Sequence, residues 1–103
     1  MSKTKIKVVW SNDAKADLHY IYKRTLRKTK SLINSKNVKK DILQSIKDIQ
    51  FPEQYQVDEF LGVPYRRVVG RHFKVIYVVE NETSIIILEI FDTHRSPSKM
   101  RKG

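Results

Sequence analysis

The chain has 103 residues, of which 40% are hydrophobic and 31% charged, and it contains no cysteine. This length suits one globular domain, 1–103, and the composition is not that of a disordered chain. Without cysteine, disulfides, thiol nucleophiles and thiolate metal sites are excluded. The longest aliphatic run, Ile85–Leu88, is far shorter than the ~18 residues of a membrane span, and the first residues do not form a signal-peptide pattern. We therefore expect a cytoplasmic protein.

The charge is strongly positive and unevenly distributed. Lysine and arginine number 21 against 11 aspartate and glutamate residues, a formal net charge of +10. Residues 1–50 carry 13 basic and 4 acidic side chains, and no carboxylate lies between Leu18 and Lys40. Such a field attracts polyanions or an acidic partner, although a basic helix face can also serve solubility alone. The candidates for nucleic-acid or target binding are Lys23, Arg24, Arg27, Lys28, Arg67 and Arg71.

The first half of the chain predicts a strand and a long helix. The β-branched stretch 6–10 is typical of a short strand. Ser11 is a candidate N-cap, and Asp13 falls in the first helical turn, where a carboxylate is favourable. Apolar residues then recur at helical spacing, which predicts an amphipathic helix from Asn12 to about Thr29.

A second helix is predicted after a short polar connection. Asn34 or Ser35 can provide its N-cap, and Phe51-Pro52 ends it, because a residue before proline avoids the helical conformation. Its apolar stripe is Val38, Ile42, Ile46 and Ile49. The short connection indicates an antiparallel helical hairpin, which must bury its stripes against a further surface.

The second half of the chain predicts that surface. Three predicted strands, 65–69, 72–79 and 84–91, are separated by turn signals at Gly70-Arg71 and 81–83, as in an antiparallel meander. Trp10, Phe73, Val75 and Tyr77 are expected to face the core. The sequence therefore predicts an α+β fold of order β-α-α-β-β-β, with the N-terminal helical hairpin packed on one face of an antiparallel sheet.

Several local strings, taken in order, resemble the RelE/ParE superfamily of toxins, and most closely its ParE-like branch. The strings are Trp10-Ser11 with Ala14 and Asp17-Leu18, Pro52 with Tyr55, Gly62 with Tyr65-Arg66-Arg67, Lys74–Tyr77, and Ile90–Arg95 with Pro97. They cover almost the whole chain. The resemblance implies the toxin of a type II toxin–antitoxin pair, which inhibits growth when free. It also implies a cognate antitoxin, which we expect to be acidic and partly disordered alone.

The family divides by target. Its RelE-like branch resembles a ribosome-dependent ribonuclease, whose chemistry needs an acid or base and positive charge on the reacting phosphate. The candidate catalytic residues are Arg66, Lys74, His94 and Arg95, with Arg66 and Lys74 expected on the sheet face that the helices leave open. Each also has a structural interpretation, such as a strand arginine whose stem covers apolar surface. The ParE-like branch is associated instead with DNA gyrase and acts by binding.

Two departures count against the ribonuclease. Val68 occupies a strand position that is basic in the family's ribonucleases, and no tyrosine follows Phe91 where those enzymes carry a catalytic one. Tyr77 is interpreted as a core aromatic and Asp92 as a local capping or pairing group. The enzyme status is therefore left open, with a ribosome or mRNA target and a gyrase target as alternatives. A non-toxic nucleic-acid-binding module and an inactivated toxin are the remaining interpretations.

The open sheet face is also expected to be an interaction surface. Val68, Ile76 and Val78 are predicted to be exposed there, where an antitoxin segment or a second copy of the chain could cover them. A homodimer or a toxin–antitoxin heterotetramer is possible. His19 and His72 have no third ligand at matched spacing, and no phosphate loop or dinucleotide fingerprint is present, so no metal or cofactor is expected.

Overall fold

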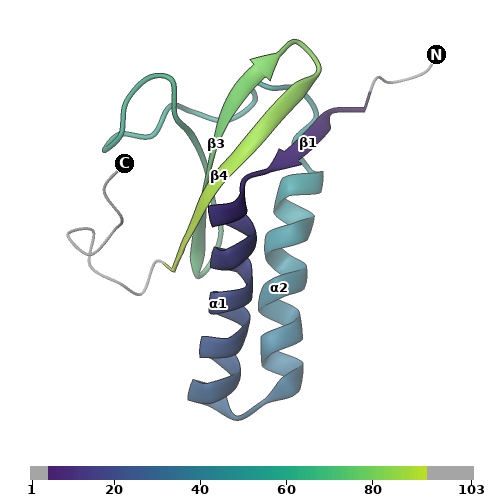
Figure 1. Ribbon diagram of the computed structural model, residues 1–103, viewed down its shortest axis with the longest axis vertical. Coiled ribbons are helices and arrows are strands. Elements are labelled where there is room, and N and C mark those ends of the chain that lie inside the picture. The colour runs from purple at the N-terminus through teal and green to yellow at the C-terminus, as the bar shows by residue number, and fades with distance from the viewer. Residues whose placement is uncertain (1–4, 93–103) are drawn as a thin grey trace.

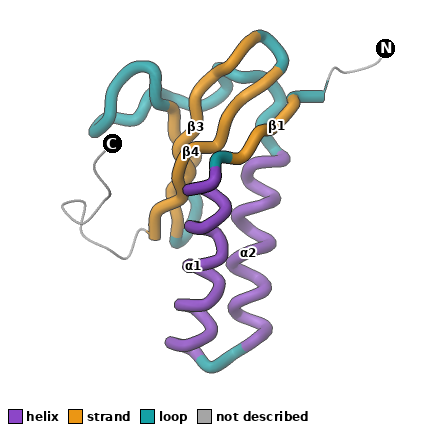
Figure 2. The backbone as a smooth tube through the Cα atoms, viewed as in Figure 1, coloured by secondary structure: helices purple, strands orange, loops and turns teal. Residues whose placement is uncertain are grey.

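Two helices and a four-stranded sheet make up the part of the chain that the computed structural model describes, residues 5–92 (Figure 1, Figure 2). Their bounds are Lys7–Trp10 for β1, Asn12–Thr29 for α1, Leu32–Lys47 for α2, Arg66–Val69 for β2, Phe73–Asn81 for β3 and Ser84–Asp92 for β4. The elements follow one another in the predicted order, so the expected α+β fold is confirmed.

Helix α1 has the predicted bounds, and Ser11 determines where it begins. The Ser11 hydroxyl oxygen accepts a hydrogen bond from the Ala14 N–H at 3.0 Å, as an N-cap does. The same hydroxyl donates to the Leu88 carbonyl at 2.8 Å, which ties the start of the helix to β4. At the other end, Lys30 adopts the left-handed conformation (φ 54°) and donates its N–H to the Leu26 carbonyl.

Helix α2 begins earlier than predicted, because Ser31 is its N-cap. The Ser31 hydroxyl oxygen accepts from the Asn34 N–H at 3.1 Å. The predicted caps Asn34 and Ser35 are therefore wrong: Ser35 is fully buried inside the helix and donates its hydroxyl to the Ser31 carbonyl at 3.0 Å. The helix ends at Lys47, and Ile49 reaches the core from the segment that follows. Within the described residues, neither helix is long and apolar enough to cross a membrane.

The strands lie in the order β1-β4-β3-β2. Strands β2, β3 and β4 form the predicted antiparallel meander. Strand β1 pairs with β4 in parallel, so the sheet is mixed, and the expectation of an antiparallel sheet holds for the meander alone. Parallel pairing is available to β1 because the helical hairpin and two strands separate it from β4, and a parallel connection needs such a length.

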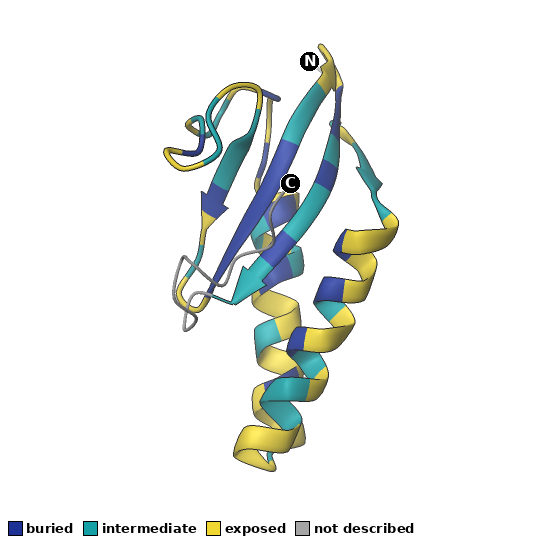
Figure 3. Cartoon of the chain, turned by 60° about the vertical axis from the view of Figure 1, so that its left-hand side comes forward, coloured by how far each residue is buried: buried dark blue, intermediate teal, exposed yellow. Residues whose placement is uncertain are grey.

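The hydrophobic core lies between the sheet and the helical hairpin, and Figure 3 shows buried residues on the facing sides of both. Phe73, Val75 and Tyr77 are each 3% exposed or less, and Trp10 packs against the core partly buried, as predicted. The Tyr77 hydroxyl donates to the Pro52 carbonyl at 2.7 Å, and burial raises the pKa of this phenol. Tyr77 is therefore a core aromatic with a satisfied hydroxyl.

The helical hairpin is longer than the sheet that it covers. Its connecting end projects beyond the strands (Figure 1). Leu32 and Ile33 lie at this end and are 49% and 72% exposed.

Candidate functional site

The segment that precedes β2, residues 55–65, covers part of the outer edge of this strand; we call it the edge segment. Val57 and Arg66 form an antiparallel bridge, and the Arg67 N–H donates to the Gln56 carbonyl at 3.0 Å. An open strand edge is a ready site for pairing with another chain. The edge segment therefore leaves less of the β2 edge open for pairing with another chain.

Lys74 and Asp58 form a buried ion pair that joins the edge segment to β3. The Lys74 Nζ atom lies 2.9 Å from Asp58 Oδ1; Lys74 is 8% exposed and Asp58 is fully buried. Asp58 Oδ2 accepts from the N–H groups of Phe60 and Leu61 at 3.0 and 2.9 Å. Burial alone would raise the pKa of Asp58, but the bond and charge of Lys74 and these two N–H groups outweigh it and lower the pKa. Lys74 is therefore an anchor of the edge segment.

The two strand arginines lie on opposite faces of the sheet, and the predicted face of Arg66 is wrong. Arg66 is the direct cross-strand partner of Tyr77, whereas Arg67 is the partner of Ile76. Direct partners in an antiparallel pair share a face, so Arg66 lies on the helix side. Arg67 lies on the open face together with Lys74. The sheet thus separates Arg66 from Lys74, the two residues that were expected to act together.

Both guanidinium groups bind the backbone of the edge segment. Arg66 Nη1 donates to the Tyr55 carbonyl at 2.7 Å, and Arg67 Nη1 donates to the Val57 carbonyl at 2.8 Å. Both arginines are half-buried. A charged donor to a carbonyl is a comparatively strong hydrogen bond. With Lys74, the arginines make three cationic attachments between the meander and the edge segment.

The predicted apolar surface of the open face is largely absent. The prediction that Val68 is exposed on this face is wrong, because Val68 pairs with Val75 on the helix side and is 4% exposed in the core. Ile76 does lie on the open face, but it is 1% exposed. Val78 lies on this face and is half-buried. The failure at Val68 has the same cause as that at Arg66, an inverted face assignment along β2.

Other apolar side chains are exposed on the open face, around Lys74. The rings of Phe60 and Phe91 lie 5.1 and 5.9 Å from its Nζ atom. Val69 is its direct cross-strand partner on β2. Phe60 is 65% and Val69 60% exposed, and Phe91 is half-buried. We call Phe60, Val69 and Phe91 the apolar rim.

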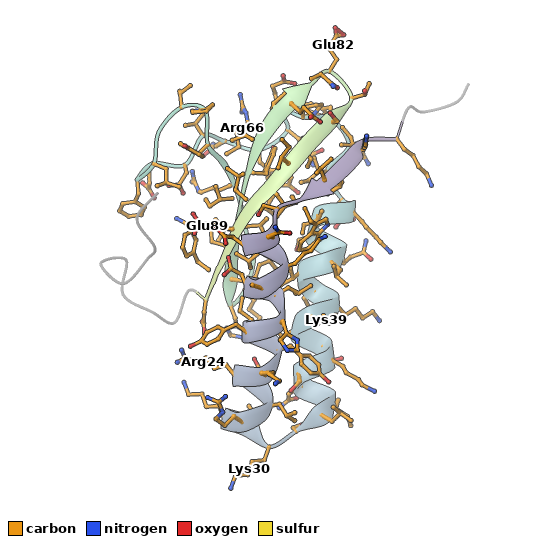
Figure 4. The ribbon with its side chains drawn as sticks, viewed as in Figure 1. Arg24, Lys30, Lys39, Arg66, Glu82 and Glu89 are labelled. Carbon is orange, nitrogen blue, oxygen red and sulfur yellow. The ribbon has the colours of Figure 1, made fainter. Side chains whose placement is uncertain are left out.

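A groove of about 520 Å³ lies between the helical hairpin and the β2–β3 turn; we call it the hairpin–turn groove. It brings together Arg24 and Lys28, one turn apart on α1, with Arg71 of the turn, which is distant from them in sequence. Arg24 Nε lies 3.7 Å from Asp92 Oδ2, and Figure 4 shows Arg24 on the side of α1 away from α2. The other lining residues are Ile21, Thr25, Thr29, Asn34, Asn37, Val38, Asp41 and His72.

The remaining predicted site residues do not join these features. Lys23 and Arg27 are exposed on α1 and do not line the hairpin–turn groove. His94 and Arg95 lie outside the described residues. Among residues 5–92, no three histidine, aspartate or glutamate side chains are grouped so that they could hold a metal ion.

Two buried carboxylates were missed by sequence reasoning. Asp58 is separated from Lys74 by 16 positions. The available signal was Lys74 itself, because a lysine inside an apolar strand needs a counter-charge, but the sequence offers several carboxylates for it. Asp17 Oδ2 accepts from the Ile90 N–H at 2.9 Å and thereby docks α1 on β4. Its position inside the apolar stripe of α1 was the corresponding signal.

The fold and these attachments define a class of protein, a β-α-α-β-β-β domain with a basic helical hairpin over a mixed sheet. The family described as "ParE toxin of type II toxin-antitoxin system, parDE" matches residues 8–97. The chain therefore belongs to the ParE family of type II toxins. A solved structure described as "Chromosomal ParDE TA system from P. aeruginosa" contains a chain of the same fold, with a TM-score of 0.70 and 23% identity over 88% of this chain and 98% of that one. No curated protein matches the chain.

Proposed function

We propose that this toxin inhibits growth by binding an essential protein, such as DNA gyrase, and not by cutting messenger RNA on the ribosome. The observation that carries the proposal is that the described cations of β2 and β3 already have partners in the chain. Lys74 pairs with Asp58, and Arg66 and Arg67 donate to backbone carbonyls. A ribonuclease needs such cations free to meet the charge that develops on the phosphate.

The hairpin–turn groove is the proposed contact with the target. Its lining combines three cations with two carboxylates, Asp41 and Asp92, and with neutral amides and hydroxyls. Lys28 and Arg71 are exposed, while Arg24 is already paired. A partly exposed lining that combines both signs of charge with neutral polar groups suits the polar rim of a protein–protein interface.

Growth after induction of the toxin alone tests the mechanism. Lys74→Met combined with Asp58→Asn removes the strand cation without leaving a buried carboxylate unpaired. A binding mechanism predicts that this double variant still inhibits growth, whereas a ribonuclease that uses Lys74 predicts full loss of inhibition. Early cuts within translated codons of cellular mRNA would also contradict the proposal. Intact mRNA with accumulating DNA breaks is the result expected for a gyrase target.

A charge-matched pair of variants tests the groove. Lys28→Gln with Arg71→Gln is expected to weaken growth inhibition at equal protein level. The control, Lys15→Gln with Lys30→Gln, changes the net charge equally at exposed positions outside the groove and is expected to inhibit like the wild type. Equal behaviour of the two variants would refute the assignment of the groove. A wild-type chain that leaves growth unaffected would favour an inactive toxin or a non-toxic binding module.

The apolar rim is the proposed site of antitoxin contact. Exposed aromatic and aliphatic side chains beside an ion pair form a patch that a folding antitoxin segment could cover. Phe60→Ala with Val69→Ala is therefore expected to weaken binding of the protein encoded next to the toxin gene. Leu32→Ala with Ile33→Ala removes similarly exposed apolar groups at the hairpin end and serves as the control. Unchanged affinity of the rim variant in calorimetry would refute the assignment.

A further inference from the structure

A second groove, of about 380 Å³, crosses the outer side of the helical hairpin and differs in character from the first. Four of its lining residues are lysines of α2: Lys36, Lys39, Lys40 and Lys47. Tyr22 of α1 and Leu43 and Gln44 of α2 complete the lining. We call these seven residues the lysine groove. Figure 4 shows Lys39 on α2, whereas Arg24 points away on the far side of α1.

The lysine groove carries an excess of positive charge. No carboxylate lines it, and among the described residues none of its four lysines has a carboxylate oxygen within 4.0 Å. The two acidic residues nearest in sequence, Asp41 and Asp48, do not line the groove. Asp41 lines the hairpin–turn groove, and Asp48 accepts a hydrogen bond from Gln44 Nε2 at 2.9 Å. All four lysines are exposed, so a solvated ligand can reach each of them.

The lysines also form a straight and rigid row. Lys36, Lys40 and Lys47 lie four and seven positions apart, which places them on one side of α2. At 1.5 Å per residue, the row extends over about 16 Å of helix. Duplex DNA carries one charge per about 1.7 Å of its axis, so roughly ten phosphates lie along the same length. The row therefore matches a linear polyanion better than a single small anion.

We propose that the lysine groove binds the phosphate backbone of double-stranded DNA. Lysine ammonium groups meet phosphates as point charges and read no base sequence, so the binding is of the backbone type. This inference stands on the α1–α2 surface alone and does not depend on the target proposed above.

The lining argues against two other ligands, single-stranded nucleic acid and an acidic peptide. Single strands gain affinity by stacking bases on aromatic rings, but the ring of Tyr22 already carries the Lys39 ammonium, 5.8 Å from its centroid. Ammonium groups do not by themselves distinguish duplex RNA from duplex DNA, so an RNA duplex is compared directly in the experiment below. An acidic peptide would need apolar pockets for its anchors, and Leu43 is the only aliphatic residue of the lining.

Fluorescence anisotropy with a labelled 24-base-pair DNA duplex and the full chain tests this proposal. The variant is Lys36→Gln with Lys40→Gln, and the control is Lys15→Gln with Lys30→Gln, which has the same net charge. At 0.1 M salt we expect the groove variant to bind about tenfold more weakly, and its plot of log K against log salt to be shallower by about 1.8. The control is expected to bind within about twofold of the wild type. Equal thermal midpoints confirm that both variants are folded.

Other outcomes would overturn the proposal. Equal losses in the two variants would mean that binding follows net charge and not the groove. The same measurement with a 24-nucleotide poly(dT), a 24-base-pair RNA duplex and a polyglutamate peptide identifies other occupants. If one of these binds more tightly than duplex DNA and its affinity depends on Lys36 and Lys40, the groove serves that ligand and the DNA assignment is wrong.

Discussion

Replacing Lys74 with methionine is expected to destabilise the folded chain by about 3–5 kcal/mol. Methionine retains most of the lysine stem beside Phe60 and Phe91, so the change removes charge with little loss of packing. Asp58 is then a fully buried carboxylate without its cation. Because Phe60 and Leu61 still donate two N–H groups to Oδ2, we expect a cost at the lower end of this range. Even that is a large fraction of the ~5–15 kcal/mol typical of domain stability.

A double-mutant cycle isolates the pair from the packing around it. Asp58→Asn keeps an oxygen that accepts from Phe60 and Leu61 but removes the negative charge. Combined with Lys74→Met, it leaves no buried charge, and this double variant should lie within about 1 kcal/mol of the wild type. Urea unfolding at equilibrium measures each free energy, with constant m-values as the check on two-state behaviour. The cost of Lys74→Met should be similar at 0.1 and 1 M salt, because a buried pair is screened little.

A cost below about 1 kcal/mol for Lys74→Met is the result that would refute this reasoning, because it is the range of a surface ion pair. Loss of the effect at 1 M salt would lead to the same conclusion. Lys74 would then be available to a ligand, and the argument against a ribonuclease would lose its main support.

Three further predictions concern the framework of the site. Gly70→Ala should cost about 1–3 kcal/mol in urea unfolding, because an added Cβ would collide with the ring of Phe73, which covers the glycine. Ser11→Ala should cost about 1–2 kcal/mol in the same assay, since it removes both the N-cap of α1 and a bond to β4. The lowered pKa of Asp58 contributes stability above the ordinary carboxyl value of about 3.9, and this contribution is lost as pH falls through the folded-state pKa. Asp58→Asn should therefore flatten the acid limb of the stability profile below about pH 4, and an unchanged limb would contradict the assignment.

The sequence alone determined the elements and their order, because the signals for them are local. Ser11 and the apolar period that follows it predict α1 with the observed bounds. The sheet face on which Arg67 lies could also have been predicted from the sequence. The Gly70 N–H bonds to the Phe73 carbonyl, and a two-residue turn of this kind places Arg67, and not Arg66, opposite the even-numbered residues of β3. That error came from assigning faces to each strand separately instead of through the turn.

Only the tertiary structure decided which charged side chains bind a partner within the chain and which do not. Asp58 reaches Lys74 because the edge segment crosses the border of the sheet, and no periodicity in the sequence encodes that path. The arginines of β2 likewise donate hydrogen bonds to carbonyl groups of a loop about ten positions upstream. By contrast, Lys36 and Lys40 have no carboxylate within ion-pair distance among residues 5–92. The number of charges follows from the composition. Which of them form ion pairs depends on the path of the folded chain, since an ion pair needs two groups within about 4 Å.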